Sequence, residues 1–269
     1  MLIGHEKLID NFKILVENNK LSHGYVFFGE PGVGKFSFAA GLAAYLETGK
    51  FQKLSRPLEE ALIIRPNEEG TISINDIRES KYFLFQKPAH SPRRTVIVND
   101  AERLTPQAQH ALLKIAEEPP ASALIMLVVS SSEALLPTLQ SRLQKIYFPR
   151  VSSKLIAAML VKQFKITKEK AFEIAKISFG RPGRAIKLVE SREPIRRLAE
   201  KSKSKKEIIE KMIESNEIME EYLTEVIAQL AKDPVGNCEK LKSILNRASL
   251  VSQLNTNKRL QLESALWNI

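Results

Sequence analysis

The chain has 269 residues, of which 43% are hydrophobic and 27% charged, a composition typical of soluble globular proteins with two or three domains. No run approaches the roughly 18 consecutive apolar residues of a membrane-spanning helix. Charges also interrupt the apolar residues from the N-terminus on, which argues against a signal peptide. Cys238 is the single cysteine, so neither an internal disulfide nor a cysteine zinc site is expected. These features predict a cytoplasmic protein with no membrane partner.

The net charge of +10 is concentrated in the second half of the sequence. Residues 1–150 carry 18 Lys/Arg against 16 Asp/Glu, whereas residues 151–269 carry 23 against 15. Such a balance fits either contact with phosphate backbones and acidic partners, or solvated faces of lysine-rich helices. Charge alone does not choose between them.

The first 150 residues alternate short apolar runs with helical patterns. Strands are predicted at 24–28, 62–64, 95–98, 123–129 and 146–148. Helices are predicted at 35–46, at 75–85, and from an N-cap at Thr105 to about 115. Strands separated by helices predict a mostly parallel sheet covered on both faces, that is, an α/β domain.

After Pro149 the strand signal ends. Three short helices are predicted at 153–164, 168–178 and 182–191, and Pro194 begins another all-helical stretch. The run KSKSKK at 201–206 is typical of a linker or an exposed segment. The predicted organisation is an α/β domain over 1–150, a small helical domain over 151–193 and a C-terminal helical domain over 194–269.

The string GEPGVGK at 29–35 lies between a predicted strand and a predicted helix, the context of a phosphate-binding loop. Gly29, Gly32 and Gly34 allow backbone N–H groups to converge on phosphate oxygens, while the helix N-terminus and Lys35 add positive potential. A plain Gly/Pro turn is the alternative. The lysine directly before the helix favours the nucleotide site.

Three positions of this site depart from what hydrolysis needs. Phe36 follows the lysine where Ser or Thr binds Mg²⁺, and a phenyl ring cannot ligate a metal. At the end of the third strand, Asn99 stands where the metal-associated Asp is expected and Asp100 where the water-activating Glu is expected. We therefore expect a site that can hold ATP or ADP without hydrolysing it, with Mg²⁺ a doubtful ligand.

Several longer strings occur in a specific order. They are HGYVFF at 23–28, INDIR at 74–78, AQHALLKIAEEP at 108–119, LLPTLQSR at 135–142 and GRPGRA at 180–185. With this order and spacing, residues 3–190 resemble bacterial sliding-clamp loader subunits of the AAA+ class, which belong to the DNA polymerase III holoenzyme. The string NTNKRLQLE at 255–263 and the degraded nucleotide site resemble the delta-prime type rather than the ATP-hydrolysing gamma/tau type.

The resemblance implies roles for two arginines. In this family the arginine of a Ser-Arg-Cys motif reaches the neighbouring subunit's ATP site as an arginine finger; here the motif reads Ser141-Arg142-Leu143. Arg184 matches the second-sensor arginine, which contacts nucleotide from the helical domain, and Ser130 lies near the first-sensor position. From the residues alone, a helix cap or an ion pair is the simpler interpretation of Arg142, and an ordinary first-turn position that of Arg184.

The resemblance also implies an AAA+-like P-loop domain, a helical lid over 151–193 and a helical collar for oligomerisation over 194–269. The implied partners are other clamp-loader subunits of gamma/tau and delta type, the sliding clamp indirectly, and primer-template DNA through the complex. The family's four-cysteine zinc module has no counterpart, since residues 47–60 contain neither Cys nor His, so no zinc is expected.

Two other functions stay open at the level of sequence. One is an ATP-hydrolysing gamma/tau-like motor or another AAA+ ATPase, against which Phe36 and Asn99 argue. The other is a DNA-binding accessory protein, suggested by the basic second half, which would bind DNA tightly and in a salt-sensitive way without partners.

Overall fold

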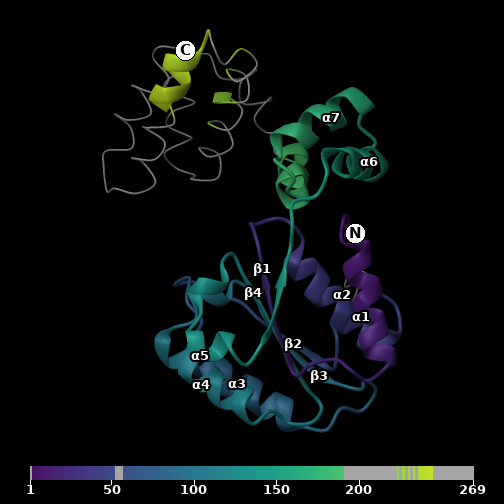
Figure 1. Ribbon diagram of the computed structural model, residues 1–269, viewed down its shortest axis with the longest axis vertical. Helices are drawn as coiled ribbons and strands as arrows, with labels where there is room; N and C mark the ends of the chain where they lie inside the picture. Colours follow the sequence, from purple (N-terminus) through teal and green to yellow (C-terminus); the bar gives the residue numbers. More distant parts are fainter. Residues whose placement is uncertain are drawn as a thin grey trace. The chain divides into compact units, whose positions relative to one another are not determined.

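The computed structural model describes residues 2–51 and 57–190, together with residues 223, 226–227, 230, 233 and 236–244. The chain divides into two compact units, Met1–Arg184 and Ala185–Ile269, and the first contains all strands of the described residues and the helices α1–α7 (Figure 1). The predicted boundary at 193/194, the 201–206 run and the 255–263 string lie outside the described residues. The division into three domains therefore stays a prediction.

A parallel five-stranded sheet forms the centre of the first unit. Its strands lie in the order β2-β3-β4-β1-β5, and all four neighbouring pairs are parallel. The bounds are Gly24–Phe28 (β1), Ala61–Ile64 (β2), Arg94–Val98 (β3), Ala123–Val129 (β4) and Gln144–Tyr147 (β5). Because the strands are parallel, their carboxyl ends share one edge of the sheet. The predicted α/β parallel-sheet class is confirmed.

Helices cover both faces of this sheet, with α1 and α2 on one face and α3, α4 and α5 on the other (Figure 1). Their bounds are Glu6–Glu17 (α1), Lys35–Thr48 (α2), Ile74–Phe85 (α3), Pro106–Glu117 (α4) and Pro137–Gln140 (α5). Ser73 and Asp76 form a capping box at the start of α3, and Thr105 accepts a hydrogen bond from the N–H of Ala108 at the start of α4. The predicted N-cap at Thr105 is confirmed.

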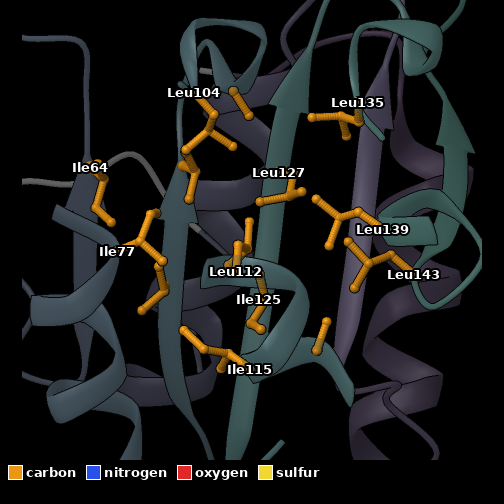
Figure 2. Packing of buried hydrophobic residues seen from close by; sticks show 14 of the residues in the cluster. Ile64, Ile77, Leu104, Leu112, Ile115, Ile125, Leu127, Leu135, Leu139 and Leu143 are labelled. Carbon is orange, nitrogen blue, oxygen red and sulfur yellow. The ribbon is translucent and has the colours of Figure 1, made fainter. Parts of the chain in front are cut away.

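Alternation along the strands divides the core into two layers. In β4, Leu124 and Met126 belong to the layer formed with α1 and α2, whereas Ile125 and Leu127 belong to the layer formed with α3 and α4. Successive side chains of a strand point to opposite faces, so a strand of seven buried apolar residues has to be covered on both sides. Figure 2 shows the second layer, with Leu112 of α4 in the same cluster as Ile125 and Leu127.

Past β5 the described chain is helical. The helices are α6 (Ser153–Phe164), α7 (Lys168–Ile177) and a further helical stretch over 182–190. Ser152 and Thr167 cap α6 and α7 by accepting hydrogen bonds from backbone N–H groups of the first turn. These helices occur where the sequence pattern predicts them.

The structure departs from the predicted elements most clearly at α1, α5, β5 and α7. Neither α1 nor the four-residue α5 is among the predicted elements. β5 runs from Gln144 to Tyr147 rather than over 146–148, because this edge strand begins with polar, exposed residues that carry no apolar signal. α7 ends at Ile177, and Ser178 is its C-cap rather than its last residue.

Candidate nucleotide site and the arginine beside α5

The phosphate loop connects the end of β1 to the start of α2. Gly29, Gly32 and Gly34 have φ angles of 141°, 82° and 111°, which residues with side chains rarely adopt. Gly34 is the N-cap of α2, and no side-chain hydrogen bond caps this helix. The N–H groups of the first turn are therefore not occupied by a capping side chain, as an anion site at a helix start requires.

Lys35 is the buried cation of this loop, with 7% of its surface exposed. Its Nζ donates hydrogen bonds to the carbonyl oxygens of Gly29 (2.5 Å) and Glu30 (2.8 Å). Burial lowers the pKa of Lys35, and the carboxylates of Glu102 and Asp100 oppose that effect. The loop thus holds its ammonium group with its own main chain.

Phe36 is half-buried on the first turn of α2 and packs against the α1/α2 layer. Arg65, the exposed residue that follows β2, places its Cζ 5.3 Å from the centroid of the Phe36 ring. This distance is that of a cation–π contact. The position after Lys35 is thus occupied by a ring with a guanidinium over it.

The acidic motif at the end of β3 is also altered. Nδ2 of Asn99 donates to Oδ2 of Asp100 at 2.8 Å, and Asp100 has a positive φ of 53°. Burial, and next the charge of Glu102, raise the pKa of Asp100 above its ordinary value of 3.8, while nearby cations, Lys35 foremost, act in the opposite direction. The carboxyl of Asp100 is thus bonded to the neighbouring amide.

Glu102 is a site residue that the sequence analysis did not single out. Its Oε1 accepts a hydrogen bond from Oγ of Ser130 at 2.8 Å, and its Oε2 is buried without a hydrogen-bond partner in the described part of the chain. Ser130 follows β4, and its carbonyl accepts from the N–H of Gly29 at 3.3 Å. Their positions in the sequence could have identified this pair. Glu102 and Ser130 follow neighbouring parallel strands, whose carboxyl ends share one edge of the sheet.

Glu30 of the phosphate loop forms ion pairs with two arginines distant in sequence. Its Oε1 accepts two hydrogen bonds from Arg150, from Nη2 and, at 2.9 Å, from Nε. Oε2 lies 3.9 Å from Nε of Arg181. The hydrogen bonds from Arg150 are the main cause that holds the pKa of Glu30 below its ordinary value of 4.5. This pairing joins the loop to the chain that follows β5.

The start of the helical stretch 182–190 touches the loop through main-chain atoms. The N–H of Gly183 donates to the carbonyl of Gly32 at 2.8 Å. A Cβ on Gly183 would lie 3.1 Å from Cα of Gly32, which leaves no room for a larger residue without a shift. Arg184, the predicted second-sensor arginine, has its backbone N next to Gly32 and its Cζ 5.5 Å from the centroid of the Phe179 ring. Its predicted contact with nucleotide stays a prediction.

The N-terminal segment also contacts the loop. His5 is buried, and its Nε2 lies 2.9 Å from the carbonyl oxygen of Val33. A Cβ on Gly34 would lie 2.8 Å from Cδ1 of Leu2, so the chain ahead of α1 closes over the loop at this point. Neither contact was predicted, because no sequence pattern links these residues to the loop.

Arg142 is not among the partners of the loop. Its Nη2 lies 2.8 Å from Oε1 of Glu117 at the end of α4, and its Nη1 donates to the carbonyl of Thr138 at 2.8 Å. The side chains of Arg142 and Glu117 are 37% and 43% exposed. The structure therefore contains both the ion pair and the helix cap that the sequence left open as the simpler interpretation. The role of Arg142 at a neighbouring subunit stays a prediction.

The residues at the loop fit a phosphate group, but they lack two of the oxygen ligands that hold Mg²⁺ in a hydrolysing site. The glycine loop, the uncapped start of α2 and Lys35 supply the positive potential that phosphate oxygens need. Mg²⁺ requires near-octahedral oxygen ligands, whereas Phe36 offers none and Asn99 only a neutral amide oxygen. Within the described residues no three His, Cys, Asp or Glu side chains form a metal-binding group. No described helix has the length and apolar character to cross a membrane.

Comparison with known proteins agrees with the motifs. Residues 4–152, more than half of the chain, match the family described as "DNA polymerase III, delta subunit". DNA polymerase III subunit gamma/tau of Mycobacterium tuberculosis is 28% identical over 174 residues, which cover 60% of this chain and 30% of that protein. DNA polymerase III subunit delta' of Pseudomonas aeruginosa is 29% identical over 135 residues, 45% of this chain and 41% of the relative. The match thus spans less than half the length of either relative.

Solved structures share the fold. A DNA polymerase III gamma subunit-related protein from Thermotoga maritima superposes with a TM-score of 0.57 at 24% identity, over 96% of this chain and 97% of its own. The RuvB Holliday junction branch migration motor of the same organism gives a TM-score of 0.52 at 16% identity, over 78% and 69%. At these identities the likeness shows the AAA+-like P-loop fold alone. Through its family match, the chain belongs to the family described as "DNA polymerase III, delta subunit", and its relatives include gamma/tau and delta' subunits of DNA polymerase III.

Proposed function

We propose that this chain is a non-hydrolysing, delta-prime-type subunit of the clamp loader of the replicative DNA polymerase III. The observation that carries the proposal is the pair of Phe36 and Arg65 at the position where the phosphate loop needs a metal-binding hydroxyl. Asn99 of the acidic motif after β3, whose amide donates to Asp100, also supports the proposal. The loop keeps its glycines and Lys35, so it holds ATP or ADP without turnover.

The chemical contribution of the chain lies at its surface, in Arg142. A guanidinium aimed at the γ-phosphate of a neighbouring subunit stabilises charge that develops in the transition state, a role worth roughly 10³–10⁵ in rate. Arg142 is partly exposed and is held by two acceptors of its own chain. It can therefore meet a neighbouring surface with its guanidinium already oriented.

The remaining parts of the proposal concern assembly. The helices after β5 serve as the lid, and residues 194–269 serve as the collar that joins the ring of subunits. The partners are gamma/tau-type and delta-type subunits, with the sliding clamp engaged indirectly and primer-template DNA met through the complex. No zinc is required.

Reconstitution tests this function. The full chain is mixed with gamma/tau-type and delta-type subunits of the same organism, and the products are separated by size-exclusion chromatography. We expect a stable hetero-oligomer that loads the clamp onto primed DNA, and no loading when this chain is left out. A complete, active loader without this chain contradicts the proposal.

The second candidate is an ATP-hydrolysing motor of gamma/tau type. It is favoured by the names of several relatives and by the retained Lys35. It predicts phosphate release by the isolated chain, which the first candidate does not.

A further inference from the structure

The position of the missing magnesium ligand is filled by an aromatic–guanidinium pair. Phe36 is the first residue after Lys35, and Arg65 is the first residue after β2. Cζ of Arg65 lies 5.3 Å from the centroid of the Phe36 ring. A permanent positive charge therefore stands over the ring that replaces the metal-binding hydroxyl.

The main chain places this charge beside the acidic motif. The N–H of Asn99 donates to the carbonyl of Ile64 at 2.9 Å, so Arg65 follows directly on a residue hydrogen-bonded to that motif. The charge of Arg65 also acts on Asp100, whose pKa it lowers against the effect of burial. Arg65 thus lies between the two elements that hold a metal ion in a hydrolysing site.

We propose that Arg65 takes the place of the metal ion, so that the phosphate loop binds a nucleoside diphosphate in the absence of divalent cations. This inference rests on the proposed retention of nucleotide binding. A guanidinium is suited to the task because its planar N–H groups bind phosphate oxygens in pairs. Contact with the Phe36 ring is electrostatic and does not itself require an N–H donor, so donors remain for an anion.

Replacing the metal ion by Arg65 explains how the site can bind nucleotide without hydrolysing it. A divalent ion can both neutralise phosphate charge and organise a reactive water molecule. An arginine neutralises charge but has no lone-pair acceptor or coordination sphere for water. Arg65 therefore supports the first task and not the second.

Isothermal titration of the full chain with ADP tests the inference, once in excess EDTA and once with Mg²⁺. We expect the two Kd values to agree within about twofold, since Phe36 and Asn99 stand where a hydroxyl and a carboxylate would hold the metal. Arg65→Ala weakens binding in EDTA about tenfold, the size of one lost charge-assisted contact. Arg78→Ala, which removes the same charge from the exposed surface of α3, leaves the Kd unchanged. Thermal melts confirm that each variant is folded.

The outcomes separate this inference from the proposed function. A Kd that improves at least tenfold with Mg²⁺, in wild type and Arg65→Ala alike, overturns the role of Arg65 while nucleotide binding stands. No ADP binding by the folded chain in either buffer overturns the inference and the retained nucleotide site. The clamp-loader role is decided independently, by assembly with gamma/tau-type and delta-type subunits.

Discussion

Nη2 of Arg142 and Oε1 of Glu117 lie 2.8 Å apart, and this contact joins the second residue after α5 to the last turn of α4. The carbonyl of Thr138 holds the other terminal nitrogen of the same guanidinium. Because both charged side chains are more than a third exposed, the pair contributes at most about 1 kcal/mol to the stability of the chain. The arginine is oriented without being locked, so a neighbouring anion can recruit it.

Arg142→Ala is expected to leave the fold of this chain intact and to lower ATP hydrolysis by the neighbouring subunit. The melting temperature of the isolated chain stays within a few degrees of wild type, since the lost contact is worth about 1 kcal/mol or less. In the reconstituted loader, ATP turnover stimulated by DNA and clamp falls by roughly 10³-fold or more. Arg142→Lys restores little, because lysine lacks the planar fork. Unchanged turnover removes the arginine finger, and a collapsed melting temperature makes Arg142 a structural residue.

Glu117→Gln is expected to reduce the same turnover by a smaller factor than Arg142→Ala. The substitution removes the charge that orients the guanidinium but leaves the bond to Thr138. Glu118→Gln is the matched control, since Glu118 is the adjacent exposed carboxylate at the C-cap of α4. Kinetics of the reconstituted loader measure both variants. Added to Arg142→Ala, Glu117→Gln should cost nothing further, and an additive loss contradicts a shared role.

The isolated chain is expected to release no phosphate from ATP above the buffer rate. Phe36 and Asn99 replace two ligands of Mg²⁺, and the carboxyl of Asp100 is bonded to a neighbouring amide. Steady-state phosphate release is compared between wild type and Lys35→Ala, with the assembled loader as the positive control. Turnover in wild type that disappears in Lys35→Ala would establish an active ATPase instead.

The ion pair of Glu30 is expected to make the stability of the folded chain depend on pH in the acidic range. The pKa of Glu30 in the folded chain lies below its ordinary value of 4.5, mainly through hydrogen bonds from Arg150. A lowered carboxyl pKa contributes stability above pH 4.5 and loses it as the pH falls through the folded-state value. Glu30→Gln and Arg150→Ala should therefore melt below wild type at neutral pH, and the Glu30→Gln difference should vanish in acid. A Glu30→Gln difference that persists in acid assigns the effect to packing.

Much of the fold is predictable from sequence, because its signals are local. The apolar run of β4 and the cap at Thr105 each identify an element without reference to the rest of the chain. α1 was missed although Leu8, Phe12 and Leu15 recur at helical spacing; Phe12 is its single buried residue, and half of its side chains are polar. α5 has only four residues, too few for a helical period to show.

The site is predictable where its residues are neighbours in sequence. The glycines, Lys35 and Phe36 form one string, and their places in the loop follow from it. The contacts of Glu30 with Arg150 and of Phe36 with Arg65 cross 120 and 29 positions. Such pairs depend on strand order and loop course, which no local pattern encodes. Glu102 was not predicted although it is close to the acidic motif in sequence. The motif assigns roles to positions 99 and 100 and none to an acid two positions after Asp100.

The contact between Gly32 and Gly183 involves main-chain atoms alone. Substitutions elsewhere in the loop do not remove the carbonyl or the N–H that form it, whereas a side chain at Gly183 would push the two backbones apart. This hydrogen bond between loop and helix therefore does not depend on which catalytic side chains the loop carries. A chain can therefore lose the side chains needed for hydrolysis and still hold the phosphate loop in the same position against the helix.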